Sequence, residues 1–311
     1  MLDFNLLFLN LFVGQISQSD KQLIGLQNFR NNMELFESKT KLRSYIEEAK
    51  NSGKTVGFVP TMGALHEGHI SLVKKSNANN DITVVSIFVN PTQFNDKNDL
   101  KNYPRTLEKD LLLLEEAGAN IVFNPSEQEM YPEPDSRVFN FGQLDKVMEG
   151  AHRPGHFNGV AQIVSKLFDA VPATNAYFGL KDFQQLAIIR QLVKQLNFPI
   201  NIIACDIVRE PDGLAMSSRN LLLTPEHRTN AVQISQTLFS AQKQKGLTSV
   251  LDIKKWVVDT LNKNEYLEVE YFDIVDGTTL QSIEKWSDAD YIVGCIAVKA
   301  GKIRLIDNVS F

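Results

Sequence analysis

Short runs of β-branched and aromatic residues alternate with amphipathic stretches along much of the chain. The runs predict buried strands, and the stretches, whose apolar residues recur at helical spacing, predict helices. The predicted strands are residues 55–59, 82–89, 121–123, 176–178 and 200–208, and the predicted helices are residues 39–51, 106–117, 159–170 and 183–196. Because strands that alternate with helices form parallel sheets through right-handed crossovers, this region is predicted to be an α/β domain.

The pattern changes after Arg209. Residues 210–213, Glu-Pro-Asp-Gly, signal a turn. Beyond them we expect helices over 225–244 and 249–262 and strands over 267–275, 291–299 and 303–307. Only Ala300-Gly301 and Lys302 separate the last two strands, which predicts an antiparallel hairpin. We therefore expect a smaller C-terminal α+β domain over 209–311, next to an α/β domain over 33–208.

Composition limits the functional classes. The 311 residues are 43% hydrophobic and 22% charged, which is typical of a soluble globular protein. With 32 basic and 37 acidic side chains the net charge is −5, which argues against a general nucleic-acid binder. Cys205 and Cys295 each lie in an apolar, strand-like run and offer no disulfide framework, so a cytoplasmic location is expected.

The first thirty-two residues stand apart from this pattern. Residues 4–13 are apolar, but they follow Asp3, lack a basic leading segment and a clean cleavage site, and are too short to span a bilayer. We therefore expect neither a signal peptide nor a membrane anchor. Residues 1–32 are interpreted either as the product of an upstream start assignment or as a poorly ordered extension.

The stretch at residues 59–69, Val-Pro-Thr-Met-Gly-Ala-Leu-His-Glu-Gly-His, has the pattern of a strand, a turn and a helix start. Free N–H groups and the helix dipole favour an anion at such a start, and Gly63 and Gly68 let it approach the backbone. His66 and His69 lie close enough to face the same anion. Two alternatives stay open: a metal site, for which no third ligand is spaced nearby, and a capped helix whose histidines only hydrogen-bond the turn.

Several polar stretches begin where a predicted strand ends. They are residues 60–69, 90–94, 179–185 and 210–220. Ligands of open parallel sheets collect outside the carboxyl ends of the strands, so we expect these distant segments to form one site.

Five motifs in this order resemble those of the pantothenate synthetases, the ATP-dependent ligases that join pantoate to β-alanine. Besides the turn, they are residues 86–94 (SIFVNPTQF), 153–159 (RPGHFNG), 179–185 (GLKDFQQ) and 216–220 (MSSRN). The resemblance runs from about Met33 to Phe311. It implies a Rossmann-like nucleotidyltransferase domain, a C-terminal lid domain and a homodimer.

The resemblance also implies the chemistry. ATP adenylates pantoate, diphosphate leaves, and β-alanine then displaces AMP from the pantoyl adenylate. His66, His69, Lys181 and Arg219 are the expected catalytic residues, with His69 matching the residue designated as proton donor. The implied ATP contacts are Met62, Gly63, Ala64, Leu65, His66, Glu67, Gly68, His69, Gly179, Leu180, Lys181, Asp182, Val208, Met216, Ser217, Ser218 and Arg219.

Two of these ATP segments, residues 179–182 and 216–219, also have other interpretations. Many relatives carry an acidic residue where this chain has Leu180, which leaves the role of that side chain open but not that of its segment. Outside the motif, Lys181 would be interpreted as a solvated lysine. The motif at 216–219 resembles a mobile loop that closes on diphosphate, and the alternative is a serine-rich turn that caps the next helix.

Gln93 and Gln185 are expected to hold pantoate, because a neutral amide can both donate to and accept from hydroxyls and a carboxylate. Arg153 and His156 are secondary candidates for the same pocket, with loop structure as the alternative. A triphosphate implies Mg²⁺. Asp110 lies in the region that supplies acidic side chains near the metal in relatives, but it is equally compatible with a helix surface charge, and the protein ligand stays unassigned.

Two rival functions remain at this stage. The HxGH and MSSR motifs also occur in other nucleotidyl transferases, including aminoacyl-tRNA synthetases, but this acidic chain lacks their RNA-binding modules. The other rival is a non-catalytic nucleotide-binding protein. The intact cationic and hydroxyl side chains of the motifs argue against it. The expected partners are therefore small-molecule substrates, with no nucleic acid and no membrane.

Overall fold

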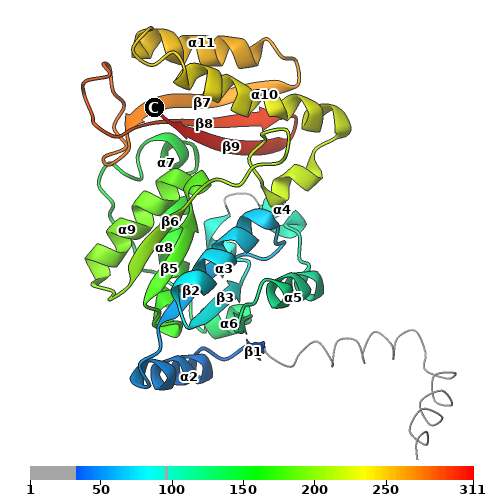
Figure 1. The fold of residues 1–311 in the computed structure, drawn as a ribbon, viewed down its shortest axis with the longest axis vertical. Coiled ribbons are helices and arrows are strands. Elements are labelled where there is room, and N and C mark those ends of the chain that lie inside the picture. The colour runs from blue at the N-terminus through cyan, green and yellow to red at the C-terminus, as the bar shows by residue number, and fades with distance from the viewer. Residues whose placement is uncertain (1–32, 95–96) are drawn as a thin grey trace, which may run out of the picture.

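The computed structural model describes residues 33–94 and 97–311. The expectations for residues 1–32 therefore lie outside the described residues. Within them the chain forms a parallel sheet with helices on both faces, and a smaller antiparallel sheet that lies across one end of it (Figure 1).

The larger sheet is parallel throughout. Its strands are β1 (Glu34–Phe36), β2 (Val56–Thr61), β3 (Ile82–Ile87), β4 (Ile121–Phe123), β5 (Asn175–Gly179) and β6 (Asn201–Cys205), in the order β1-β4-β3-β2-β5-β6. After β2 the chain moves outward through β3 and β4, whereas β5 and β6 lie on the other side of β2. The order reverses between β2 and β5, and a ligand site is expected outside the carboxyl ends of these two strands.

Helices cover both faces of this sheet because its strands alternate their side chains. Phe58 packs into a core with α2 (Lys39–Asn51), α8 (His156–Ala170) and α9 (Phe183–Leu196). Val59 points to the opposite face and packs with α3 (Glu67–Asn79) and α5 (Leu107–Glu116). Shorter helical segments lie in the connections: η1 (Pro91–Gln93), α4 (Lys97–Asn102), α6 (Glu127–Met130), α7 (Met148–His152), η2 (Leu180–Asp182) and η3 (Ser218–Leu222).

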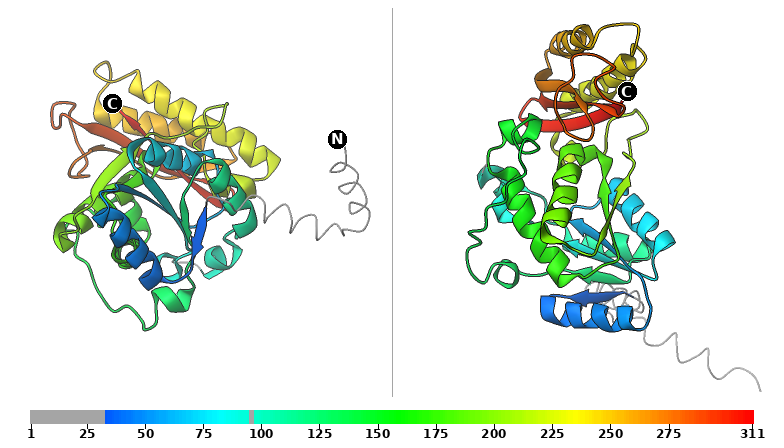
Figure 2. Two further views of the ribbon diagram at one scale, coloured as in Figure 1. Left: turned by 60° about the horizontal axis from the view of Figure 1, so that its bottom comes forward. Right: turned by 90° about the vertical axis from the view of Figure 1, so that its left-hand side faces the viewer.

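The C-terminal region packs two helices against an antiparallel sheet. It contains α10 (Pro225–Gln242), α11 (Val250–Asn262) and the antiparallel strands β7 (Leu267–Asp276), β8 (Ile292–Ala300) and β9 (Ile303–Ser310). The two helices and one face of the sheet enclose their own apolar core. Figure 2 shows this sheet between those helices and the parallel-sheet region. Its other face is therefore available to close a site.

Most elements agree with the sequence-based prediction. The helices at 39–51 and 183–196 have the predicted bounds, and the hairpin after β8 is present, with Gly301 at φ +62° in its turn. Strand β6 ends at Cys205, so the predicted extension to Val208 is wrong. The edge strand β1, Glu-Leu-Phe, was not predicted because it has no β-branched residue, whereas the equally short β4, Ile-Val-Phe, was predicted from its β-branched residues.

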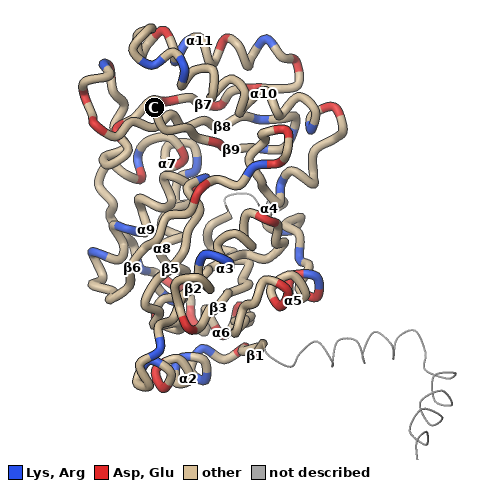
Figure 3. Tube along the Cα trace, viewed as in Figure 1, with Lys and Arg blue, Asp and Glu red and all other residues tan. Residues whose placement is uncertain are grey.

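Surface character adds little to the functional assignment. Lys and Arg are interspersed with Asp and Glu over the described residues (Figure 3). None of the helices described is both long enough and apolar enough to cross a membrane. Cys205 and Cys295 are both free and buried, as expected.

Candidate active site

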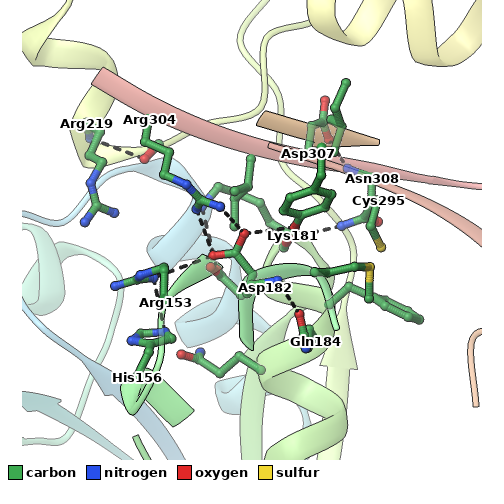
Figure 4. A pocket seen from close by; sticks show the side chains of 18 of the residues that line it. Arg153, His156, Lys181, Asp182, Gln184, Arg219, Cys295, Arg304, Asp307 and Asn308 are labelled. Atoms are coloured by element: carbon green, nitrogen blue, oxygen red, sulfur yellow. Dashed lines mark hydrogen bonds and ion pairs between the residues drawn. The ribbon is translucent and has the colours of Figure 1, made fainter. Parts of the chain in front are cut away.

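A cavity of about 850 Å³ opens between the parallel-sheet region and the C-terminal sheet. Its wall includes Lys181 and Gln185 after β5, Ser217 and Arg219 of the 216–219 motif, and Arg304 of β9. Figure 4 shows Arg153 and His156 together on one side, with the strand that carries Arg304 across from them. Segments 179–185 and 210–220 thus meet at this cavity, as predicted, whereas no residue of 60–69 or 90–94 is among those that line it.

One buried carboxylate holds the turn after β2 through two hydrogen bonds. Asp110 in α5 is 1% exposed, and its two oxygens accept the N–H groups of Ala64 (2.9 Å) and Leu65 (2.8 Å). Thr106 also donates to Asp110 Oδ1. The interpretation of Asp110 as a helix surface charge is therefore wrong. Gly63, at φ +80°, leaves little room for a Cβ, which would lie 3.1 Å from Asp110 Oδ2.

Two histidines cap the helix that follows. His66 Nδ1 accepts the N–H of Gly68 (3.1 Å), and His69 Nδ1 accepts the N–H of His66 (3.4 Å). These N–H groups are engaged within the protein, as are those that Asp110 binds. The expectation that free backbone N–H groups of this turn bind phosphate is therefore wrong for these residues, and the capped-helix interpretation describes the backbone correctly.

The same hydrogen bonds determine which ring nitrogen carries the proton. An Nδ1 that accepts an N–H has no proton, so each neutral imidazole carries its proton on Nε2. The ring centroids of His66 and His69 are 4.1 Å apart. The helix start therefore carries two adjacent imidazole rings, each with its proton on Nε2.

Both histidines are neutral at physiological pH. Burial and then the charge of Lys181 lower the pKa of His66 to about 4. Burial, His66 and Lys181 together lower the pKa of His69 to about 3. At this pH both side chains can donate a hydrogen bond from Nε2, and neither ring carries a second proton.

The Lys181 segment is held by the C-terminal sheet. Asn308 in β9 donates from Nδ2 to the carbonyl of Leu180 (2.8 Å) and to that of Lys181 (3.1 Å). Lys181 lies 3.6 Å from the carboxylate of Asp182, and both side chains line the cavity. Leu180 packs against apolar clusters from both regions. This packing accounts for an apolar side chain at that position.

The 216–219 motif begins beside the histidines. A Cβ on Gly68 would lie 3.8 Å from Met216 Cβ, so the loop crosses the start of α3. The N–H of Met216 donates to the carbonyl of Val208 (3.0 Å), which lies in this loop and not in β6. Ser217 accepts from the N–H of Arg219 and caps η3, and both residues line the cavity. The serine-capped turn and the cavity wall are therefore the same segment.

The two glutamine candidates occupy different places. Gln93 donates to Met62 Sδ (3.0 Å) and accepts from Asn90, which puts its amide against the turn after β2. Gln185 lines the cavity at the start of α9. Its neighbour Gln184 is buried and donates to the carbonyls of Leu144 and Val147, so the amide of Gln184 is committed to the protein backbone.

Arg153 and His156 line the cavity, but they also hold the Gln93 segment. His156 Nδ1 donates to the carbonyl of Gln93 (2.9 Å), and Arg153 Nη1 donates to His156 Nε2 (3.2 Å). Burial, and then the charge of Arg153, lower the pKa of His156 to about 4. These contacts give both residues a structural role in the loop, and their assignment to the pantoate pocket stays a prediction.

Several residues of the cavity wall were not found from the sequence. Glu149 precedes the 153–159 motif, and Arg304, Asp307 and Asn308 lie on β9. Asp307 is buried and forms a bidentate pair with Arg209, whose atoms lie 2.7 and 2.9 Å away. Period-two alternation along β9 could have shown a polar face, but not the surface that this face meets.

The described carboxylates limit how a metal could be held. Among residues 33–94 and 97–311, no three or more His, Cys, Asp or Glu side chains are grouped to hold a metal ion. Glu149 and Asp307 are bound to arginines, whereas the side chain of Asp182 is 45% exposed at the cavity. Mg²⁺ usually needs only one or two carboxylates beside substrate phosphates, so this donor set fits a phosphate-held ion.

Comparison with known proteins decides the family. A sequence model of the pantoate–β-alanine ligases matches residues 34–310. The chain belongs to this family. The pantothenate synthetase of Bacteroides fragilis (strain YCH46) is 58% identical over 270 residues, which are 87% of this chain and 96% of that protein. That of Phocaeicola vulgatus is 57% identical over 280 residues, 90% of this chain and 99% of the relative.

Solved structures of the family share the fold. The pantothenate synthetase of Thermus thermophilus is 40% identical, with a TM-score of 0.83, and the match covers 89% of this chain and 99% of that one. The Francisella tularensis ligase, complexed with β-γ ATP and β-alanine, is 35% identical with a TM-score of 0.76, covering 89% and 97%. The recognition of the family from its ordered motifs is confirmed, as are the fold class and the ligase activity. The assignment to other nucleotidyl transferases is set aside.

Proposed function

We propose that this chain condenses (R)-pantoate with β-alanine to give pantothenate, AMP and diphosphate, through a pantoyl adenylate. The observation that supports this reaction is the pair of Nε2–H donors of His66 and His69 at the point where the strand order reverses. The charge of Lys181 acts on both rings. Fixed donors of this kind stabilise charge that develops on a phosphoryl oxygen.

In the first step, a carboxylate oxygen of pantoate attacks the α-phosphorus of ATP and the bond to diphosphate breaks. We assign hydrogen bonds to the α-phosphate oxygens to His66 and His69, and the charge of Lys181 to the same group. Because Nε2 of both rings is protonated while the rings are neutral, this role needs no proton transfer. Gln93 and Gln185 are assigned to pantoate, whose hydroxyls and carboxylate suit amides.

We assign Ser217, Ser218 and Arg219 to the diphosphate, since hydroxyls and a guanidinium suit its oxygens. Mg²⁺ would neutralise charge on the phosphates, with Asp182 as the cavity carboxylate open to it. In the second step, the β-alanine nitrogen attacks the carbonyl carbon of the adenylate. The bond to AMP breaks, and the amine loses a proton.

The remaining assignments follow from the same proposal. Residues 33–208 form the nucleotide- and pantoate-binding domain, and residues 209–311 form a lid that contributes Arg219 and the β9 wall. Two free, buried cysteines suit the cytoplasm. A homodimer rests on the family resemblance, and sedimentation at micromolar concentration would test it.

Pyrophosphate exchange tests the first half-reaction. Labelled diphosphate is incubated with ATP, Mg²⁺ and the protein, with or without pantoate, and without β-alanine. Exchange into ATP that requires pantoate is the expected result, because it reports reversible adenylation. No exchange by protein that is shown to bind ATP would contradict the adenylate and favour nucleotide binding without turnover.

A further inference from the structure

Glu149 connects the two regions of the molecule. It lies in α7 of the parallel-sheet region and is only 8% exposed. Arg304 of β9 donates to both of its oxygens, at 2.8 and 2.6 Å, and the hydroxyl of Tyr271 in β7 donates to Oε1 at 2.8 Å. A carboxylate from one region is therefore bound by two side chains of the other.

The same carboxylate also lies close to a second arginine, Arg153, which lines the cavity. Arg153, one helical turn further along, lies 3.6 Å from Glu149 Oε2 and donates to His156 Nε2. His156 in turn donates to the carbonyl of Gln93. A continuous path of polar contacts thus leads from β9 to the segment that carries a proposed pantoate residue.

Each link in this path depends on its neighbours. A neutral imidazole has one donor and one acceptor, so a His156 that donates from Nδ1 to Gln93 has an unprotonated Nε2, which accepts from Arg153. Burial opposes the charge of Glu149, but hydrogen bonds and charge from Arg304 outweigh it and keep the pKa of Glu149 below its usual value. The carboxylate is therefore a stable counter-ion for both arginines.

Packing transmits a shift at His156 to the Gln93 segment. Gly159, one turn beyond His156 in α8, approaches η1 so closely that a Cβ there would lie 2.3 Å from the carbonyl oxygen of Thr92. At the other end of the path, the N–H of Glu149 donates to the buried amide of Gln184. The path is thus fixed in tightly packed backbone at both ends.

We propose that Glu149 is a positioning residue that couples the seating of the C-terminal domain to the geometry of the pantoate-binding segment. Arg304 and Tyr271 hold its carboxylate, which holds Arg153, and Arg153 with His156 holds the carbonyl of Gln93. The inference rests on the proposed function, since it takes Gln93 as a pantoate contact. It adds a consequence, namely that a change in β9 alters pantoate binding without touching pantoate.

Glu149→Gln tests the coupling, because it keeps the size of the side chain and removes its charge. We expect the KM for pantoate to rise about tenfold, which corresponds to about 1.4 kcal/mol, while the KM for ATP changes less than about twofold. The control is Glu270→Gln, which removes the other carboxylate partner of Arg304, bound at 2.8 and 2.6 Å, and leaves Glu149 in place. This control should leave both KM values within about twofold of the parent.

A second variant and a second measurement guard against a folding defect. Arg304→Lys retains the charge but loses the two-point contact, and it should also raise the pantoate KM more than the ATP KM. Binding of pantoate measured by calorimetry gives a readout that needs no turnover. The double variant Glu149→Gln/Arg304→Lys should lose less pantoate binding free energy than the sum of the losses in the two single variants.

The outcomes separate the two proposals. Equal increases in both KM values, a lower melting temperature with unchanged KM values, or an equal effect of Glu270→Gln would overturn the coupling and leave an ordinary interdomain contact. If the parent protein binds pantoate without exchange, the adenylate proposal fails and the calorimetric comparison still decides the coupling. A parent protein that binds no pantoate would overturn both.

Discussion

The turn after β2 and the loop before α10 lie next to each other, where Gly68 approaches Met216, but they are held in different ways. In the turn, Asp110 accepts hydrogen bonds from N–H groups that lie 45 and 46 residues away in sequence. The two histidine rings accept hydrogen bonds from two further N–H groups. In the loop, the bonds of Met216, Gly213 and Arg219 join residues that are close in sequence. Leu221, in η3, is 81% exposed.

This difference indicates that the turn and the loop have different roles. The turn offers donors whose positions are fixed before substrate arrives, which is what stabilisation of developing charge requires. The backbone hydrogen bonds of Met216 and Arg219 join residues within the loop, which is typical of segments that can close over a ligand. Four predictions test this comparison.

The largest effect is expected at His69. Both His69→Ala and His69→Asn should lower the rate of pantoate-dependent pyrophosphate exchange by about 10²–10³, because both remove the Nε2–H donor. The Asn oxygen can replace Nδ1 as acceptor for the N–H of His66, so this variant should keep the parent melting temperature. Near-normal exchange by His69→Asn would show that the ring contributes only its capping bond.

Asp110→Asn should affect both rate and stability. An amide has one acceptor oxygen, so one of the N–H groups of Ala64 and Leu65 would face an NH₂ group, at a cost of about 1–3 kcal/mol in the free energy of unfolding. Urea unfolding measures this loss. Exchange should also fall, and raising Mg²⁺ should not restore it. Recovery at high Mg²⁺ would identify Asp110 as a metal ligand instead.

Arg219→Lys should change the rate but not the stability. Lysine loses the two-point contact with phosphate oxygens, and we expect exchange to fall about tenfold. Because lysine keeps the charge and leaves the backbone hydrogen bonds of η3 in place, the free energy of unfolding should stay within about 0.5 kcal/mol of the parent. Leu221→Ser in the same loop is the matched control and should alter neither quantity. A large loss of stability in Arg219→Lys would contradict the idea of an adjustable loop.

The last prediction concerns the pH dependence of stability. The pKa values of His66, His69 and His156 are about 4, 3 and 4, whereas an unfolded histidine titrates near its usual value of about 6.5. Below a pH of about 6.5 the histidines of the unfolded state bind protons, whereas those of the folded state stay neutral. Stability should therefore fall as pH drops from about 6.5 to about 4, by about 1.4 kcal/mol per pH unit for each histidine.

Urea unfolding at several pH values measures this slope. His66→Asn, which keeps an acceptor for the N–H of Gly68, should reduce the slope by roughly one histidine's share. An unchanged slope would mean that His66 binds a proton in the folded protein as readily as in the unfolded chain. The rigid, dehydrated turn would then be the wrong description.

Periodicity and turn residues determined much of the architecture. The helices at 39–51 and 183–196, the hairpin near Gly301 and the change of pattern after Arg209 all depend on neighbouring residues, and all were predicted. The motif order led to the family, and the strand-end positions of 179–185 and 210–220 predicted two segments of the cavity wall. The short strand β1 was missed because Glu-Leu-Phe lacks the β-branched residues from which the equally short β4 was predicted.

Only the tertiary structure decided how the site is held together. The sequence placed His66 and His69 at a helix start, but their tautomers depend on hydrogen bonds to Gly68 and His66, and their pKa values depend on burial and on Lys181. Asp110, Glu149 and Arg304 act through partners 45 to 155 residues away. Such contacts leave no periodic trace in the sequence, because they depend on which surfaces the completed fold brings together.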